Sequence, residues 1–114
     1  MSDSAIKNLM DVEYLDSDQL GISYQRFEPG FVSIDGHSHE VQEEAYVILS
    51  GSGQIKLGDE VVELKKWDVV RVAPKVVRGF DAGPDGLELI AVGAKKPEGG
   101  DGVIAKGRWA APGA

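Results

Sequence analysis

The amino acids at positions 37–51, HSHEVQEEAYVILSG, combine a polar segment with a β-rich one. The run from Ala45 to Leu49 is apolar and contains β-branched and aromatic side chains, which predicts a strand. His37, His39 and Glu44 come just before it. Two imidazoles and a carboxylate that meet at one point can hold a divalent metal ion and leave coordination positions open for a substrate. The stretch therefore predicts a strand with a metal site at its beginning.

Further β-rich runs follow along the chain, with Gly-rich turns between them. Short strands about ten residues apart predict an antiparallel sandwich or barrel, because closing or doubling a sheet removes its exposed edges. Only residues 4–10 have helical spacing, and a strand is nearly as well supported there. The expected strands cover residues 22–25, 31–34, 45–49, 54–57, 61–64, 68–72, 76–80 and 87–92, with a loop at 50–53, a hairpin turn at 58–60 and a turn at 81–86.

The chain has 114 residues, 42% of them hydrophobic, which suits one compact domain with one core. We expect an N-terminal arm at 1–20, a barrel at 21–94 and a C-terminal tail at 95–114. Pro and Gly dominate the tail, so we expect it to lack a core of its own. Apolar tail residues such as Ile104 and Trp109 would then dock on the barrel or on a second subunit.

The charge balance argues against several classes of partner. Nineteen acidic and twelve basic residues give a formal net charge of −7, and the basic residues are scattered along the chain. Nucleic acid and membrane surfaces are therefore poor partners. The absence of Cys excludes disulfides and zinc-thiolate sites. Neither a signal peptide nor a membrane-spanning apolar run is visible, so we expect a cytoplasmic protein.

The spacing of the candidate ligands resembles the first motif of the cupins, a family of small jelly-roll barrels with two motifs facing a central cavity. That motif runs Gly, a few residues, His-x-His, three or four residues, Glu, six residues, Gly. The matching residues are Gly30, His37, His39, Glu44 and Gly51, although Gly30 lies one residue farther from His37 than usual. The resemblance implies an all-β fold, an antiparallel double-stranded β-helix or jelly-roll barrel. It also implies a homodimer, since cupins commonly pair by strand exchange or sheet packing.

The second cupin motif is matched less well. Residues 67–78 have its length, but Trp67 stands for the first Gly, Ala73-Pro74-Lys75 replaces Pro-x-Gly, and Arg78 replaces the His. The resemblance as a whole covers roughly residues 20–93. A guanidinium stays protonated and has no lone pair to donate, so Arg78 is not a metal ligand.

Three protein donors remain, namely His37, His39 and Glu44, and they suit Fe, Mn, Ni or Zn as a divalent ion. At about 6 Å, Arg78 would repel a dication by roughly 5–6 kcal/mol at an effective dielectric constant of about 20. An anionic ligand that bridges the metal and Arg78 would offset this repulsion. In the contrary arrangement, Glu44 pairs with Arg78 across the cavity and the two imidazoles bond to water.

Some alternatives stay open at this point. A bare His-x-His is also common in surface loops. Glu43 is a rival carboxylate, because it too follows His39 at a permitted distance, but Glu44 has the six-residue spacing to Gly51 and is preferred.

Three residues are candidates for contact with a substrate. Arg78 would anchor an anion, Gln42 would contact the substrate or a bound water, and Tyr46 would reach into the cavity from its strand. The alternatives are a surface ion pair for Arg78, a solvated loop position for Gln42, and a core position for Tyr46. Tyr24, Trp67 and Phe80 are likewise expected in the core or the barrel wall.

These residues predict a metal-dependent oxygenase or isomerase that acts on a small organic acid. No general base beyond Glu43 or Glu44 is evident, so whether the protein is an enzyme stays open. The alternative is a non-catalytic module that binds or senses a small ligand without metal. A third interpretation is a structural domain that dimerises through a barrel face.

Overall fold

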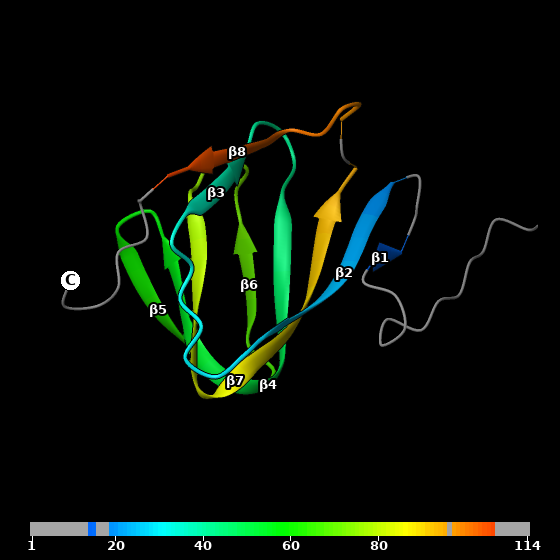
Figure 1. Ribbon diagram of the computed structural model, residues 1–114. Helices are drawn as coiled ribbons and strands as arrows, with labels where there is room; N and C mark the ends of the chain where they lie inside the picture. Colours follow the sequence, from blue (N-terminus) through cyan, green and yellow to red (C-terminus); the bar gives the residue numbers. More distant parts are fainter. Residues whose placement is uncertain (1–13, 16–18, 96, 107–114) are drawn as a thin grey trace, which may run out of the picture.

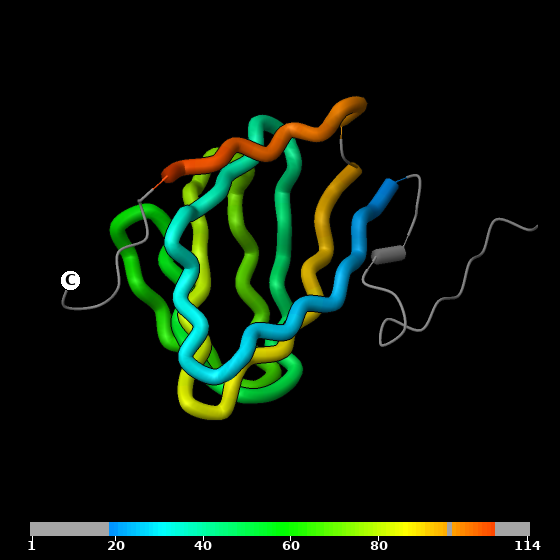
Figure 2. The backbone as a smooth tube through the Cα atoms, viewed as in Figure 1, coloured from blue at the N-terminus to red at the C-terminus, as the bar shows by residue number. Residues whose placement is uncertain are grey.

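The computed structural model describes residues 14–15, 19–95 and 97–106, and they form an antiparallel β-barrel (Figures 1 and 2). The predicted fold class is confirmed, since these residues contain eight strands and no helix. No helix long and apolar enough to cross a membrane is found among them. The strands are β1 (Tyr14–Leu15), β2 (Leu20–Phe27), β3 (Gly36–His39), β4 (Glu44–Leu57), β5 (Glu60–Lys65), β6 (Val69–Val72), β7 (Arg78–Ala94) and β8 (Gly102–Ala105).

Two long strands, β4 and β7, form the framework of the barrel. They pair with each other from Glu44 opposite Gly93 to Leu57 opposite Arg78. On its other edge, β4 pairs first with β6 and then with β5. The start of β7 pairs with β3, and its last part pairs with β2. Each long strand therefore belongs to two half-sheets, one that includes β1, β2 and β6 and one that includes β3, β5 and β8.

The long strands bend where they pass from one half-sheet to the other. The pairing register of β4 with β7 shifts between Gly51 and Gly53. Gly51 has a φ of +79°, and a Cβ at this position would lie 2.0 Å from the carbonyl oxygen of Gly86. Only glycine fits so close a crossing. The predicted loop at 50–53 and turn at 81–86 are therefore wrong, because these glycines bend two continuous strands instead of ending them.

One further expectation differs from the structure, and one strand lies beyond the expected barrel. Residues 31–34 do not form a strand, and Val32 makes only an isolated bridge to Asp81. The sheet also continues past residue 94, because β8 pairs with all four residues of β3 and lies beside it across one end of the barrel (Figure 1). The domain limits at 20 and 94 stay a prediction. The expected helix or strand at 4–10 and the expected docking of Trp109 lie outside the described residues.

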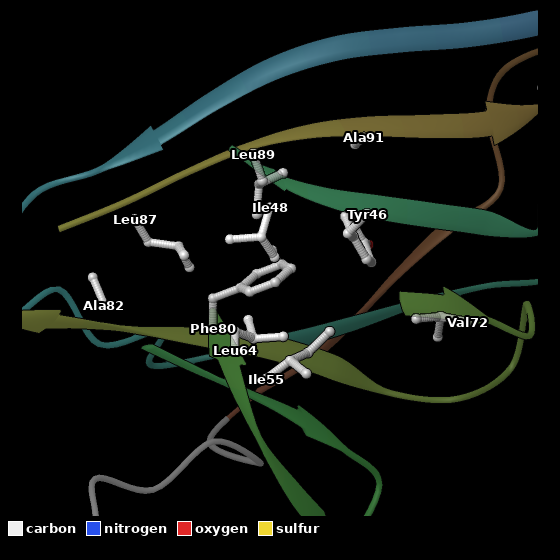
Figure 3. Close-up of a cluster of buried hydrophobic side chains, with 10 residues drawn as sticks. All are labelled: Tyr46, Ile48, Ile55, Leu64, Val72, Phe80, Ala82, Leu87, Leu89 and Ala91. Carbon is white, nitrogen blue, oxygen red and sulfur yellow. The ribbon is translucent and has the colours of Figure 1, made fainter. Parts of the chain in front are cut away.

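The hydrophobic core fills the space between the two half-sheets (Figure 3). Buried and less buried side chains alternate along most of β4 and along the last part of β7, as the pleat of a strand requires, whereas the first five residues of β7 are all buried. The ring of Phe80 reaches into the middle of the cluster and meets Tyr46 edge-on, with 5.0 Å between the ring centroids. Each large apolar side chain buried in this way contributes about 1.5–3 kcal/mol. The members are Tyr46, Ile48, Ile55, Leu64, Val72, Phe80, Ala82, Leu87, Leu89 and Ala91.

Trp67 is not in the core or the barrel wall, as the sequence predicted, but is 67% exposed. It lies in the turn between β5 and β6, where its amide donates a 2.7 Å hydrogen bond to the carbonyl of Ile48. Its φ is +72°, in the left-handed region that costs a residue with a Cβ about 1–2 kcal/mol. This is the position at which the second cupin motif has glycine. The turn therefore keeps the backbone conformation of a glycine while carrying an indole.

We expect Trp67→Gly to raise the free energy of unfolding by about 1 kcal/mol, because glycine relieves the left-handed strain. Urea denaturation measures the change. Trp67→Ala is the matched control, since it removes the indole and keeps the Cβ, and should give no such gain. An equal gain in both variants would show that the exposed indole, and not the backbone, is responsible.

Candidate metal centre

β3 and the first residue of β4 carry the three candidate ligands. Successive side chains of a strand alternate between its faces, so His37 and His39 project from the same face of β3 and Ser38 projects from the other. Glu44 begins β4. The barrel therefore brings together the two imidazoles and the carboxylate that the sequence singled out.

A carboxylate oxygen lies at the centre of this cluster. Glu44 Oε1 is 3.2 Å from His39 Nε2 and 3.8 Å from His37 Nε2. One ligand atom from each residue lies within 4.8 Å of the others. Two ligands bonded to one ion at about 2.0–2.2 Å lie at most about 4.4 Å apart, and both distances from Glu44 Oε1 to the imidazoles are shorter than this.

The protonation of His39 decides whether the cluster fits a metal. His39 Nδ1 lies 2.9 Å from Asp101 Oδ1, and an ionised carboxylate can only accept, so Nδ1 donates and, in the neutral ring, Nε2 keeps its lone pair. Within the described part of the chain, this buried Nε2 has no hydrogen-bond partner. It faces Glu44 Oε1, which is also an acceptor. A cation between the two atoms would satisfy both, so the residues present fit a divalent metal.

The surroundings of Glu44 favour its charged form. Burial by itself would raise the pKa of this carboxyl, but the imidazole of His37, 3.8 Å away, and a hydrogen bond from Tyr46 oppose that effect. The positive charge of Arg78 acts in the same direction, and the pKa is lowered to about 2. Tyr46 donates from its hydroxyl to Oε1 over 2.7 Å. Glu44 is therefore an anion at neutral pH, as a metal ligand must be.

The comparison with known protein families matches residues 23–93 to the cupin domain, which is more than half of the chain. The chain belongs to the cupin family. The resemblance inferred from the first motif is thereby confirmed.

Solved structures with the same fold include a cupin protein from Bacteroides fragilis, with 32% identity and a TM-score of 0.64 over 68% of this chain and 66% of that one. An uncharacterized conserved protein with a double-stranded β-helix domain from Klebsiella pneumoniae has 22% identity and a TM-score of 0.74. The match covers 90% of this chain and 98% of that one. A mutant salicylate 1,2-dioxygenase from Pseudoaminobacter salicylatoxidans, in complex with gentisate, has 18% identity and a TM-score of 0.63. The match covers 69% of this chain and 21% of that one. The last two show similarity of fold alone. None of the curated proteins matches this cupin.

Arg78 occupies the place of the second-motif histidine in this cupin, and its side chain is fully buried. Its Nη1 donates to the carbonyls of Pro74 and Val76 over 3.1 and 2.9 Å. Its Nη2 lies 3.6 Å from Glu44 Oε1, so the pairing of Glu44 with Arg78 considered from the sequence is present. Arg78 does not line the cavity beside the histidines. The geometry thus makes it a structural cation behind Glu44 and does not support the expected role of substrate anchor.

A cavity of about 260 Å³ opens beside the three candidate ligands. Gln42 lines it, and its side-chain nitrogen already donates to the carbonyl of Ala94 over 2.9 Å, so its contact with a substrate stays a prediction. A Cβ added to Gly93 would lie 2.4 Å from that nitrogen, so small residues keep this space open. The lining residues are Gly21, Ser23, His37, His39, Gln42, Glu44, Ala91 and Gly93.

Two other candidates lie away from the cavity. Tyr46 is 2% exposed and belongs to the core, so it reaches the cluster only through its hydrogen bond to Glu44. Glu43 has a half-exposed side chain that pairs with Arg71. Of the two rival carboxylates, it is therefore Glu44 that lies with the histidines, as the spacing to Gly51 favoured.

Asp101 is the residue of this centre that the sequence did not reveal. Its side chain is only 4% exposed and contacts His39 from the segment that leads into β8. In the sequence it is one of many acidic residues, in a part of the chain expected to be a tail. No spacing rule connects it with His39, which lies 62 positions earlier.

Glu44 should make the stability of the metal-free protein depend on pH. Because its pKa is lowered from 4.5 to about 2 on folding, the ionised carboxylate stabilises the fold above pH 4.5, and this contribution is lost as the pH falls toward 2. We expect Glu44→Gln to lower the free energy of unfolding by about 2–3 kcal/mol at pH 7 and by progressively less below pH 4.5. Urea denaturation in the presence of a chelator measures both curves. A difference that stays constant down to pH 3 would contradict this account.

Proposed function

We propose that this cupin is a metal-dependent enzyme, an oxygenase or isomerase of a small organic acid, with a divalent Fe, Mn, Ni or Zn ion held by His37, His39 and Glu44. The observation that carries the proposal is the buried, unpartnered His39 Nε2, which faces Glu44 Oε1 at 3.2 Å within the described part of the chain. Two acceptors at this distance repel each other unless a proton or a metal ion lies between them. A bound divalent ion supplies Lewis-acid chemistry, and a redox-active one also activates O2.

The arrangement of protein groups favours a ligand that binds directly to the metal. Three protein donors leave coordination positions open, and the cavity lies beside them. Its volume of about 260 Å³ falls below the range of about 300–1,000 Å³ that is usual for drug-sized ligands, so the substrate is small. Because Arg78 is sealed in the wall, we propose that the negative charge of the substrate is met by the metal itself. A salicylate 1,2-dioxygenase is among the proteins with this fold, which agrees with this class of substrate.

The homodimer expected from the family resemblance is part of the proposal. Val61 and Val69, on β5 and β6, have 56% and 64% of their surface exposed. A second copy of the chain that covered these strands would remove apolar surface from water.

One observation favours a different function, a ligand-binding or sensing module without metal. Arg78 is a permanent cation 3.6 Å from Glu44 Oε1, and it supplies part of the positive charge that a metal would bring. In that case His37, with a side chain that is 38% exposed, would bind the ligand by hydrogen bonds from the cavity wall.

Metal content separates the two functions. We expect protein purified without a histidine tag to contain close to one transition metal ion per chain by elemental analysis. Calorimetric titration of the metal-free protein with Zn(II) or Mn(II) measures the dissociation constant. We expect His37→Ala to raise this constant more than about 100-fold. Loss of a residue that only supports a ligand typically raises it 10–100-fold.

Glu43 and Glu44 provide the matched control for that titration. Glu44→Gln should weaken metal binding strongly, whereas Glu43→Gln, which makes the same change beside the exposed Arg71, should leave it unchanged. If the wild-type protein binds none of Fe(II), Mn(II), Ni(II) or Zn(II), the proposed metal-dependent enzyme is wrong and the binding module without metal is favoured.

Arg78→His tests whether the guanidinium weakens the metal site. The change removes a positive charge and adds a fourth donor, so we expect at least about tenfold tighter binding of Zn(II), which is about 1.4 kcal/mol. Arg78→Met removes the charge without adding a donor and should give a smaller gain. Circular dichroism checks that both variants fold, since the carbonyls of Pro74 and Val76 lose their donor. Unchanged affinity in both folded variants would mean that the metal does not sense the charge of Arg78.

A further inference from the structure

We propose that Asp101 is a positioning residue of the metal centre, which holds His39 as the Nδ1–H tautomer and thereby presents the Nε2 lone pair to the metal. The effect on metal affinity rests on the proposed function. The effect on the tautomer does not, because it is a property of the metal-free protein.

Both oxygens of the Asp101 carboxylate are engaged, which fixes its orientation. Oδ1 lies 2.9 Å from His39 Nδ1. Oδ2 accepts hydrogen bonds from the backbone amides of Val41 and Gln42, at 2.8 and 2.7 Å. Rotation of the carboxylate would break at least one of these contacts. Asp101 therefore joins the ring of His39 to the loop that leads from β3 to Glu44.

The backbone around Asp101 holds it in this place. Its carbonyl accepts a hydrogen bond from the amide of Glu40 over 3.2 Å. The next residue, Gly102, pairs with His39 where β8 lies beside β3. The side chain of His39 is 11% exposed, against 38% for His37, so the ring that Asp101 holds is also the more enclosed one. A carboxylate that orients a metal-binding histidine in this way typically changes metal affinity 10–100-fold.

The two backbone amides make Asp101→Asn a directed test. They require an acceptor, so the oxygen of the substituted side-chain amide should stay with Val41 and Gln42, and its NH2 group should turn toward His39. Nδ1 of His39 must then accept, and the proton moves to Nε2. That is the atom whose lone pair the metal needs.

We expect ¹H–¹⁵N correlation spectra of metal-free wild type, at a pH where both imidazoles are neutral, to show His39 protonated on Nδ1, and those of Asp101→Asn to show it protonated on Nε2. The chain has only two histidines, so His37→Ala identifies the signals of His39. The dissociation constant for Zn(II) should rise 10–100-fold in Asp101→Asn. The exposed Asp85→Asn makes the same change in charge and should alter neither readout.

The outcomes separate this inference from the proposed function. Wild-type His39 protonated on Nε2 would overturn it, even if Asp101→Asn fails to fold. The role of Asp101 would also be wrong if a folded Asp101→Asn variant keeps the wild-type tautomer of His39. It would be wrong as well if the tautomer switches and the affinity for Zn(II) stays unchanged. If Asp101→Asn switches the tautomer but the wild-type protein binds no metal, Asp101 still positions His39, and only the proposed function is wrong.

Discussion

The close crossing of β4 and β7 is the constraint on which the rest of the barrel depends. The carbonyl oxygen of Gly86 lies where a Cβ on Gly51 would stand, so the two strands can bend together only because position 51 has no side chain. The bend divides each strand between two half-sheets, and the apolar side chains between these half-sheets form the core. The same bend brings β3, the start of β4 and the start of β7 to one region of the barrel. Gly51, the last residue of the first motif, therefore helps to shape the barrel that brings the site residues together.

The charges near the candidate ligands do not balance within the described residues. Glu44 and Asp101 contribute two negative charges, and the buried Arg78 contributes one positive charge, which leaves a net charge of −1 if both imidazoles are neutral. Polar contacts distribute this charge: Tyr46 donates to Glu44, and two backbone amides donate to Asp101. An uncompensated charge in a low-dielectric interior is costly. A divalent ion at the cluster would change this net charge from −1 to +1, and an anionic ligand bound to that ion would bring the sum to zero.

The site combines a rigid part with an adaptable one. His39 is held by Asp101 and enclosed by the barrel, and Glu44 is held by Tyr46 from the core. His37 is more exposed and borders the cavity. This division would keep two donors in fixed positions while the third accommodates changes in coordination when a ligand enters.

Local patterns in the chain were enough to predict the all-β class, the cupin relationship, and the grouping of His37, His39 and Glu44, because alternation along a strand and the spacing to Gly51 can be read without the fold. It could not show that the glycines at 51 and 86 bend strands instead of ending them, because a glycine in either role leaves the same pattern in the sequence. The burial of Arg78 behind Glu44, and the contact of Asp101 with His39 from 62 positions away, became visible in the folded barrel alone. The physical reason is that burial, and contacts between distant segments, arise from how strands pair across the whole barrel, and no periodicity in the chain records that pairing.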